Sequence, residues 1–370
     1  MRLGVLRETA PQERRVALVP QGVERLRAAG HEVVMEAGAG KRASFPDAAY
    51  LKAGAKVSAE RGKILAESEV LLSVQVPDAE ELSAAARGTI VIGLVQQRRE
   101  ALLPAATERK LTVLAMELVP RVSKAQSMDA LSSQATIAGY QAVLLGASHL
   151  ARLLPMLTTA AGTIPPGKAF ILGAGVAGLQ AIATARRLGA VVSAFDVRPV
   201  VKEQVQSLGA SFVEAEAVSG VAEGTGGYAR ELAEEQQRKV LAAVGKHLPE
   251  MDLVISTAQV PGKAAPRLIT EEMVRGMKPG SVIVDLAVET GGNCELSRPE
   301  ETVVAYGVSI LGPLNLASQI PQHASVMYSR NLQSLLEYLT KEGKVQIAAD
   351  DPIAGPMTVT RDQGPVTSDQ

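Results

Sequence analysis

Residues 168–199, KAFILGAGVAGLQAIATARRLGAVVSAFDVRP, hold the pattern that decides the fold of this 370-residue chain. The aliphatic run Lys168–Leu172 leads directly into three spaced glycines, Gly173, Gly175 and Gly178, and a helical pattern follows them. In a βαβ unit, such glycines allow a tight turn, the approach of a pyrophosphate and close helix–strand packing. The N–H groups at the start of the helix then attract phosphate. The stretch therefore predicts a dinucleotide site; a glycine turn that only packs a helix on a strand is the alternative.

The end of the next aliphatic run indicates which dinucleotide would bind. Asp196 follows Gly175 by 21 residues, where an acidic side chain accepts hydrogen bonds from the adenosine ribose. A carboxylate there repels a 2′-phosphate, so NAD is favoured over NADP, and the nearby Arg198 weakens this preference. Residues that follow a later strand should pass the adenine side. The expected cofactor contacts around this turn are Gly173, Ala174, Gly175, Val176, Gly178, Asp196, Val197, Arg198, Thr257 and Ala258.

Short aliphatic runs alternate with amphipathic stretches on both sides of this unit, which is typical of parallel strands joined by helices. The length exceeds the roughly 250–300 residues at which one core stops growing. We therefore predict an α/β protein with two Rossmann-like domains, each a parallel sheet flanked by helices, separated by a cleft. The N-terminal domain should comprise residues 1–131 and be completed by residues 320–370. Residues 132–319 should form the NAD(H)-binding domain.

Several elements of these domains can be placed from pattern alone. A long helix is expected from about residue 132 to residue 154, and the last helix at residues 323–339 should pack back on the first domain. Residues 302–311 predict a single strand, and the tail from residue 350 should be extended. Thr270, followed by two glutamates, should cap a helix.

The composition excludes several classes of protein. Charges nearly balance, with 38 basic and 39 acidic residues, and aromatic residues make up only 3%, which argues against phosphate neutralisation and base stacking on nucleic acids. One cysteine, Cys294, excludes a disulfide framework and a cysteine-based zinc site, and we expect no metal. No run offers the ~20 uninterrupted apolar residues of a membrane span.

The acid–base inventory argues against a dehydrogenase of hydroxy or amino acids, which needs a proton acceptor beside the nicotinamide. None of the four histidines, His31, His149, His247 and His323, lies beside a carboxylate in a recognisable motif. Direct hydride transfer between two nicotinamide rings needs no such group at the reacting carbons. It needs near-attack geometry and the exclusion of water.

Two polar segments are candidates for holding the nicotinamide end. In residues 120–134, PRVSKAQSMDALSSQ, the side chains of Arg121, Gln126, Asp129 and Ser132 could contact its ribose and carboxamide, with Asp129 holding Arg121. An ordinary interdomain loop with a local Arg–Asp pair fits equally well. Residues 219–230, SGVAEGTGGYAR, contain four glycines and Tyr228, and fit either a lid over the nucleotide or a plain surface loop.

The whole chain resembles the NAD(H)-binding component, the first domain of the alpha subunit, of proton-translocating nicotinamide nucleotide transhydrogenase. The motifs that carry the resemblance are RETAPQERRVALVP (7–20), RVSKAQSMD (121–129), GAGVAGLQAIATARRLGA with DVRP (173–199), KEQVQSLGA (202–210), GTGGYAREL (224–232), STAQVPGKAAPRLITEEMV (256–274), VDLAVETGGNCE (284–295) and NLASQIPQHAS (315–325).

This resemblance implies roles and partners that the pattern alone does not. Arg121, Gln126 and Asp129 would form the catalytic loop at the nicotinamide end, with Arg121 orienting the ring and Gln126 binding its ribose or carboxamide. Tyr228 would belong to a mobile loop that closes over the nucleotide. The chain would be a homodimer on the cytoplasmic face of the plasma membrane, bound to membrane-spanning and NADP(H)-binding subunits. The complex would couple NADH + NADP⁺ ⇌ NAD⁺ + NADPH to proton translocation.

Alanine dehydrogenases are related by fold, and this sequence departs from them at two positions. The lysine and histidine that bind the keto acid and handle protons in those enzymes match Gln75 and Gln96 here, and their aspartate matches Glu289. The substrate-binding arginine is retained as Arg15. Because a neutral amide cannot act as a base, the resemblance favours the transhydrogenase. An alanine dehydrogenase-like amino-acid oxidoreductase and a non-catalytic NAD-sensing module are the alternatives.

Overall fold

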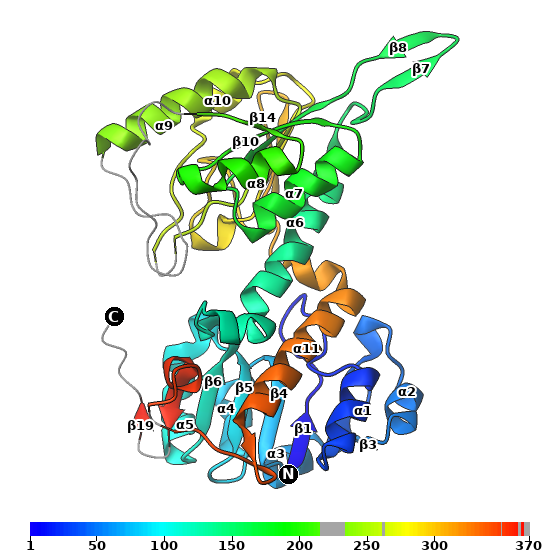
Figure 1. Cartoon of the computed structure of the whole chain (residues 1–370), viewed down its shortest axis with the longest axis vertical. Helices are drawn as coiled ribbons and strands as arrows, with labels where there is room; N and C mark the ends of the chain where they lie inside the picture. Colours follow the sequence, from blue (N-terminus) through cyan, green and yellow to red (C-terminus); the bar gives the residue numbers. More distant parts are fainter. Residues whose placement is uncertain (215–233, 261–262, 349, 362–363, 366–370) are drawn as a thin grey trace. The chain divides into compact units, whose positions relative to one another are not determined.

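The computed structural model describes residues 1–214, 234–260, 263–348, 350–361 and 364–365. The chain divides into two compact units, here called unit 1 (Met1–Gln134 with Ala317–Gln370) and unit 2 (Ala135–Leu316) (Figure 1). The sequence pattern placed the corresponding boundaries after residues 131 and 319. None of the helices formed by the described residues combines the length and the apolar character needed to cross a bilayer.

Unit 1 is built on an eight-stranded sheet in the order β19-β18-β6-β5-β4-β1-β2-β3. The strands from β1 to β6 are parallel, as the uninterrupted aliphatic runs predicted, whereas β18 runs antiparallel to β6 and β19 antiparallel to β18. The strands are β1 (Arg2–Val5), β2 (Glu32–Glu36), β3 (Lys56–Ser58), β4 (Val70–Gln75), β5 (Ile90–Leu94), β6 (Thr112–Ala115), β18 (Thr358–Arg361) and β19 (Gly364–Pro365).

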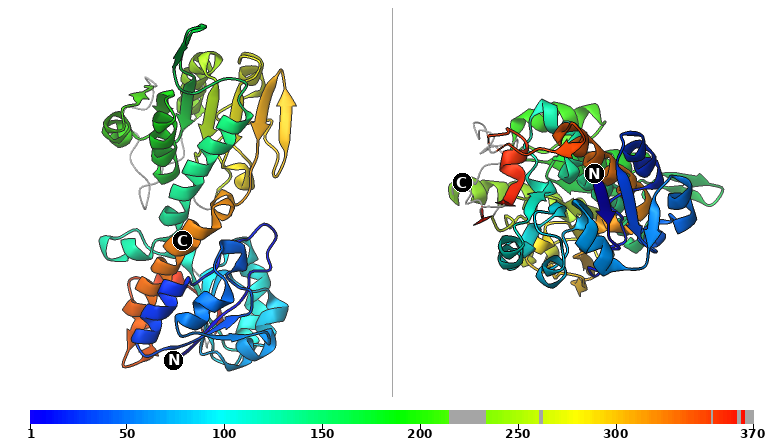
Figure 2. Two further views of the ribbon diagram at one scale, coloured as in Figure 1. Left: turned by 90° about the vertical axis from the view of Figure 1, so that its right-hand side faces the viewer. Right: turned by 90° about the horizontal axis from the view of Figure 1, so that it is seen from below.

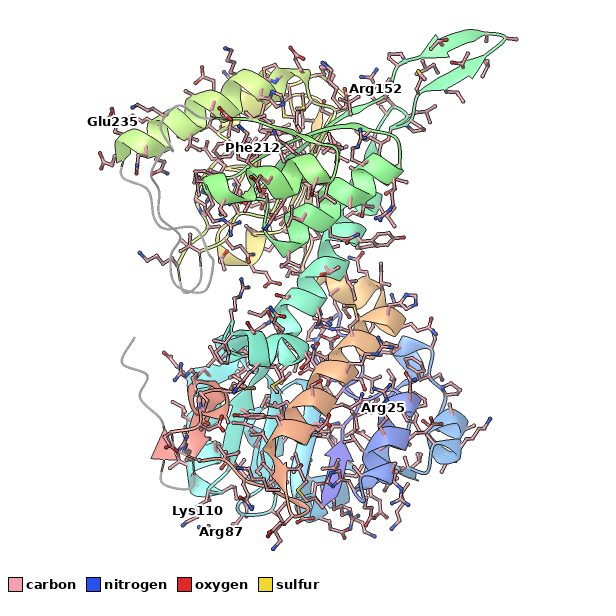
Figure 3. All side chains as sticks on the ribbon, in the orientation of Figure 1. Arg25, Arg87, Lys110, Arg152, Phe212 and Glu235 are labelled. Atoms are coloured by element: carbon pink, nitrogen blue, oxygen red, sulfur yellow. The ribbon has the colours of Figure 1, made fainter. Side chains whose placement is uncertain are left out.

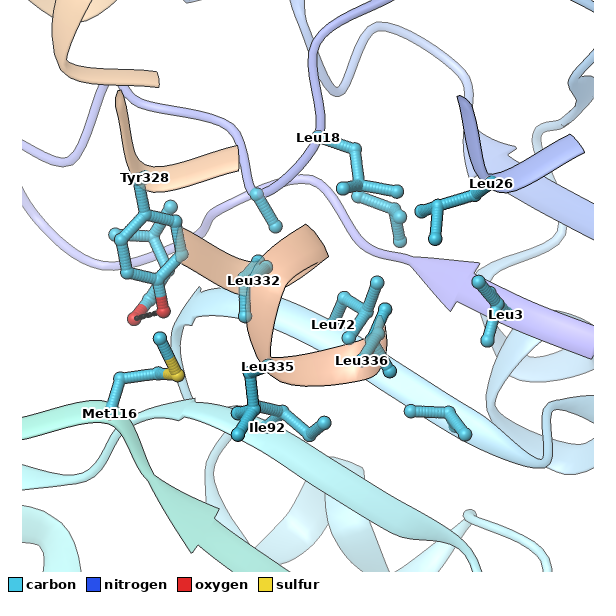
Figure 4. Close-up of a cluster of buried hydrophobic side chains, with 14 of the residues drawn as sticks. Leu3, Leu18, Leu26, Leu72, Ile92, Met116, Tyr328, Leu332, Leu335 and Leu336 are labelled. Carbon is cyan, nitrogen blue, oxygen red and sulfur yellow. Dashed lines mark hydrogen bonds between the residues drawn. The ribbon is translucent and has the colours of Figure 1, made fainter. Parts of the chain in front are cut away.

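One face of this sheet is covered by the last long helix, α11 (Pro321–Leu339). Figure 4 shows its buried side chains, among them Leu335 and Leu336, against Ile92 and Leu72 of the sheet. The prediction that this helix packs on the first domain is confirmed. The other helices of unit 1 are α1 (Pro20–Ala28), α2 (Asp47–Lys52), α3 (Arg61–Glu67), α4 (Ala79–Ser83), α5 (Arg99–Glu108) and α12 (Ala354–Met357), with 3₁₀ turns at Lys41–Ala43, Gln96–Arg98, Met116–Leu118 and Ser123–Met128.

Unit 2 is built on a seven-stranded sheet in the order β11-β10-β9-β12-β13-β15-β14, parallel except for β14. Its strands are β9 (Lys168–Leu172), β10 (Val191–Phe195), β11 (Ser211–Phe212), β12 (Leu253–Ser256), β13 (Val282–Asp285), β14 (Thr302–Ala305) and β15 (Val308–Leu311). Its helices are α6 (Ala130–His149), which begins in unit 1, α7 (Val176–Arg187), α8 (Lys202–Ser207), α9 (Glu234–His247) and α10 (Glu271–Arg275), with 3₁₀ turns at Pro199–Val201, Leu248–Glu250, Val288–Thr290 and Leu316–Gln319.

The strand order of unit 2 creates a topological switch point. The chain leaves β9 for β10 on one side and later returns to β12 on the other side of β9. In open α/β sheets, ligands bind beyond the carboxyl ends of the strands at such a point. The glycine turn follows β9 and Thr257 follows β12, so both segments lie at this edge of the sheet.

The predicted helix over residues 132–154 is wrong in its last part. Helix α6 ends at His149, and residues 157–164 form a hairpin of β7 (Leu157–Thr159) and β8 (Gly162–Ile164). Arg152, labelled in Figure 3, donates to Asp252 at 2.7 Å and so holds the chain after α6 in a non-helical path. Figures 1 and 2 show the hairpin extending away from the sheet of unit 2.

Two further expectations are corrected. Residues 302–311 form two antiparallel strands, because Tyr306 and Gly307 both have positive φ angles, 54° and 77°, as a two-residue hairpin turn of type I′ requires. The tail from residue 350 is not simply extended, because it forms α12 and then adds β18 and β19 to the sheet of unit 1. The capping role of Thr270 is confirmed, since its hydroxyl accepts the Met273 N–H at 3.3 Å.

Candidate functional site

The glycine turn after β9 leaves no room for larger side chains at two of its three glycines. Gly173 has a φ of +93°, which favours glycine. A Cβ on Gly178 would lie 1.8 Å from the carbonyl oxygen of Gly173, so α7 packs on the turn at backbone distance. A Cβ on Gly175 would meet nothing within 4 Å. The first and third glycines are therefore required by the fold, and the second faces open space.

The N-terminus of α7 begins beside this open space. Gly175 is its N-cap residue, and no side chain accepts a hydrogen bond from the first turn. Because the first N–H groups of a helix have no intrahelical acceptor, they attract an anion such as phosphate. Ala174 and Val176, which flank Gly175, lie on this same turn. The turn can thus hold a pyrophosphate against backbone amides.

Asp196 lies at the end of β10 and is nearly buried. One carboxylate oxygen accepts the Ala174 N–H at 2.7 Å, and the Arg198 guanidinium binds both oxygens at 3.0 Å and 2.9 Å. The N–H of Arg198 adds a fourth bond at 2.8 Å. Asp196 and Arg198 therefore form one bidentate pair attached to the glycine turn, with Val197 between them.

Thr257 and Ala258, beyond the end of β12, contact the glycine turn from the other side of the switch point. The Thr257 hydroxyl donates to the Gly173 carbonyl at 3.1 Å. Both backbone polar groups of Ala258 bind the side chain of Asn293, at 3.1 Å and 2.9 Å. Asn293 was not among the predicted site residues, although the motif ETGGN that contains it is visible in the sequence.

The predicted nicotinamide loop lies in unit 1 and is anchored by its apolar residues. Ala125 and Met128 are buried in the core of unit 1, whereas Arg121 and Gln126 are exposed. Asp129 accepts the N–H and the hydroxyl of Ser132, at 2.9 Å and 2.6 Å, and so caps α6. The carboxylate that we expected to hold Arg121 thus has a visible role at a helix start. Tyr228 and residues 219–230, the predicted lid, lie outside the described residues.

A buried group of charged side chains follows β1 in unit 1. Arg15 is bound through two nitrogens to Glu13, at 2.8 Å and 2.6 Å, and through a third to Gln134 at 2.8 Å. Glu8 accepts the N–H groups of Val74 and Gln75 at 2.6 Å and 3.1 Å. Burial, followed by the negative charge of Glu13, raises the pKa of Glu8 to about 8.

This group includes the retained arginine of the alanine dehydrogenase pattern. The guanidinium of Arg15 is engaged by Glu13 and Gln134 of the same chain, and the Gln75 amide lies 3.5 Å from Glu13. An amide at position 75 can donate and accept hydrogen bonds but cannot take up a proton at neutral pH. Within the described part of the chain, no three or more His, Cys, Asp or Glu side chains are grouped to hold a metal ion.

Comparison with known proteins agrees with this arrangement. The sequence matches the domain families described as "Alanine dehydrogenase/PNT, N-terminal domain" over residues 4–138 and "Alanine dehydrogenase/PNT, C-terminal domain" over residues 142–369. It is 47% identical to the first of the parts that make up the NAD(P) transhydrogenase alpha subunit of Rhodospirillum rubrum, over 98% of this chain and 97% of that protein. It is 30% identical to alanine dehydrogenase 2 of Staphylococcus aureus, over 88% and 84%.

The crystal structure of transhydrogenase from Sinorhizobium meliloti superposes with a TM-score of 0.90 at 44% identity, covering 99% of this chain and 100% of that one. Sequence and structure thus agree along the whole length. The chain belongs to the alanine dehydrogenase/PNT family, among the alpha subunits of NAD(P) transhydrogenases.

Proposed function

We propose that the chain is the NAD(H)-binding subunit of a proton-translocating transhydrogenase. It exchanges a hydride directly between its own NAD(H) and NADP(H) on a partner subunit. The observation that carries the nucleotide assignment is the glycine turn at the switch point, where Gly175 faces open space beside an uncapped helix start. When bound there, NAD(H) supplies the hydride, and the chain supplies backbone amides for the pyrophosphate.

The residues around the turn select NAD(H) through the adenosine ribose. Asp196 holds its carboxylate at the glycine turn, where it accepts the ribose hydroxyls and repels a 2′-phosphate. Arg198 offsets part of that charge through its bidentate pair. Tyr228 completes this proposed nucleotide site.

The nicotinamide end is assigned to the loop of residues 121–132. In the proposal, Arg121 orients the ring, Gln126 binds its ribose or carboxamide, and Asp129 with Ser132 keeps the loop at the start of α6. The loop offers an exposed cation and an exposed amide above buried anchors. No proton has to move at the reacting carbons, since the hydride carries both electrons.

An amino-acid dehydrogenase is the weaker proposal, because Gln75 occupies the place of its lysine and lies against Glu13. A non-catalytic NAD sensor would bind the nucleotide without passing on the hydride. The proposed partners are membrane-spanning and NADP(H)-binding transhydrogenase subunits. They would hold this chain on the cytoplasmic face of the plasma membrane.

The function is tested by mixing the purified chain with an isolated NADP(H)-binding transhydrogenase component and following hydride transfer from NADH. We expect transfer to NADP⁺ and no NADH-dependent amination of pyruvate. Arg121→Ala should slow transfer about 10- to 100-fold, because a charge-assisted contact worth ~1.5–3 kcal/mol is lost.

Lys124→Ala, which removes another exposed cation of the same loop, is the matched control and should transfer at the normal rate. Amination of pyruvate would favour the dehydrogenase, and NADH binding without any transfer would favour the sensor. A normal rate for Arg121→Ala would contradict the role of that residue.

The hairpin of β7 and β8 supports the proposal of a homodimer. Its apolar side chains are exposed, with Met156 at 65%, Leu157 at 41% and Ile164 at 45% of full accessibility. A two-stranded ribbon is at best marginally stable alone in water, so a second copy of the chain would cover it.

The solution mass should therefore fall from dimer to monomer when Leu157 and Ile164 are both replaced by aspartate, as measured by sedimentation equilibrium. Val304→Asp, at an exposed apolar residue of β14, is the control and should leave the mass unchanged. A dimeric Leu157→Asp/Ile164→Asp variant would rule out the hairpin as the interface.

A further inference from the structure

The side chain of Asn293 makes four hydrogen bonds and is fully buried. Its oxygen accepts from the Ser256 hydroxyl at 2.6 Å and the Ala258 N–H at 3.1 Å. Its nitrogen donates to the Ala258 carbonyl at 2.9 Å and the Pro266 carbonyl at 2.8 Å. An amide has two donor hydrogens and two acceptor positions, so the hydrogen-bonding capacity of this group is completely used.

These four bonds join three separate segments of unit 2. They tie the segment after β12, the segment at Pro266 and the turn after β13 to one another. The backbone carbonyl of Asn293 adds bonds from the N–H groups of Leu268 and Ile269, at 2.9 Å and 3.0 Å. The segment after β12 is thus held from its outer side by one side chain.

The same segment braces the glycine turn on its inner side. Between the two residues that Asn293 binds lies Thr257, whose N–H donates to the Leu172 carbonyl at 2.8 Å and whose hydroxyl donates to the Gly173 carbonyl at 3.1 Å. A Cβ on Gly173 would lie only 2.7 Å from that hydroxyl. A shift of Ala258 would therefore move Thr257 and, through it, the turn that receives the pyrophosphate.

We infer that Asn293 is a positioning residue for nucleotide binding, which acts through Ala258 and Thr257 on the glycine turn. This inference rests on the proposed NAD(H) site. Asn293 itself touches no nucleotide in this scheme, because its capacity is spent on the protein. It sets the position of the turn before NAD(H) arrives, and so affects the affinity for the nucleotide more than the rate of hydride transfer.

The chemistry of the amide is essential to this role. In Asn293→Asp the shape is kept, but a carboxylate oxygen replaces the nitrogen and faces the carbonyl oxygens of Ala258 and Pro266. Two attractive contacts become repulsive while the two acceptor contacts remain. The segment should move away from this carboxylate, and the brace on Gly173 should loosen.

The test measures the KM for NADH and the kcat of hydride transfer to an isolated NADP(H)-binding component. For Asn293→Asp we expect the KM to rise about tenfold, equivalent to ~1.4 kcal/mol, with kcat within about twofold of normal. A raised KM at constant kcat is the signature of lost binding that is common to ground state and transition state.

The control for a purely structural effect is Ser297→Ala. Ser297 is buried in the same connection and donates to Asp285 at 2.7 Å, with no bond to the segment after β12 among its described contacts. This variant should lower the melting temperature and keep the KM. If Asn293→Asp also lowers only the melting temperature, the inference is wrong.

A second pair of variants tests the link to the turn, and it applies even if Asn293→Asp does not fold. Thr257→Val removes the bond to Gly173 and should raise the KM, whereas Thr257→Ser keeps the hydroxyl and should restore it. In the double variant Asn293→Asp/Thr257→Val, the two effects should not add, because both act through one segment. An unchanged KM for Thr257→Val, or full additivity, would overturn the inference.

The outcome also separates this inference from the proposed function. If the wild-type chain binds no NADH in direct titration, both fall. If it binds NADH and transfers the hydride, but the Asn293 and Thr257 variants do so with the normal KM, only the role of Asn293 falls.

Discussion

Gly175→Ala should abolish NADH binding without destabilising the protein, whereas Gly178→Ala should damage both. The Cβ on Gly175 meets nothing within 4 Å, and the residue has an ordinary φ of −76°. The protein alone therefore tolerates a methyl group there. In the proposed complex the same methyl group stands where the pyrophosphate approaches the backbone.

We expect the affinity of Gly175→Ala for NADH to fall on the order of 100-fold, equivalent to ~2.7 kcal/mol, at an unchanged melting temperature. Fluorescence titration with NADH and thermal unfolding measure the two effects.

Gly178→Ala is the contrasting variant, because its Cβ would lie 1.8 Å from the Gly173 carbonyl oxygen. The helix and the turn must then move apart, and overpacking of this kind typically costs about 1–3 kcal/mol or more. We expect a lower melting temperature together with lost NADH binding. Normal NADH binding by Gly175→Ala would show that the pyrophosphate does not lie at this turn.

The unfolding free energy of the wild-type chain should contain a contribution that falls as pH rises between about 4.5 and 8, and Glu8→Gln should remove it. Burial and the charge of Glu13 raise the pKa of Glu8 from 4.5 to about 8. In this window the folded state keeps a proton that the unfolded state has released. Stability then decreases with pH, at a slope that approaches ~1.4 kcal/mol per pH unit for one full proton.

The measurement is chemical denaturation of both proteins at several pH values from 5 to 8.5. The difference in unfolding free energy between Glu8→Gln and wild type should shift in favour of the variant as pH rises. The variant starts from a lower value at acidic pH, because its amide nitrogen faces the N–H of Val74 or of Gln75.

Glu81→Gln serves as the control, since Glu81 is partly exposed and pairs with Arg61. It should leave the wild-type slope in place. A pH-independent difference between Glu8→Gln and wild type would show that Glu8 is ionised throughout this range.

Sequence patterns predicted the parallel strands well, because strands buried on both faces must be aliphatic along their whole length. They failed where a long-range contact or a special turn decided the path. The end of α6 depends on the ion pair between Arg152 and Asp252, which are far apart in the sequence. The hairpin at residues 302–311 depends on a left-handed conformation at Tyr306, a residue type that seldom signals a turn.

The functional positions divide in the same way. The spacing of the glycines and of Asp196 could be read directly, because one βαβ unit places them together whatever surrounds it. The bidentate bond of Arg198 to Asp196 could not, since proximity in sequence does not determine which groups a guanidinium binds. The engagement of Arg15 by Glu13 and Gln134 was also hidden, although it bears on the departure from alanine dehydrogenases.

The sequence by itself thus determined the two α/β units, the glycine turn and the family, because these depend on local spacing and on motifs spread along the whole chain. Only the tertiary structure decided how that turn is held in place. Asn293 binds Ser256 across 37 residues and Thr257 binds Gly173 across 84. The raised pKa of Glu8 likewise arises from burial against β4. Such effects depend on which segments meet in the folded core, and no local pattern encodes those meetings.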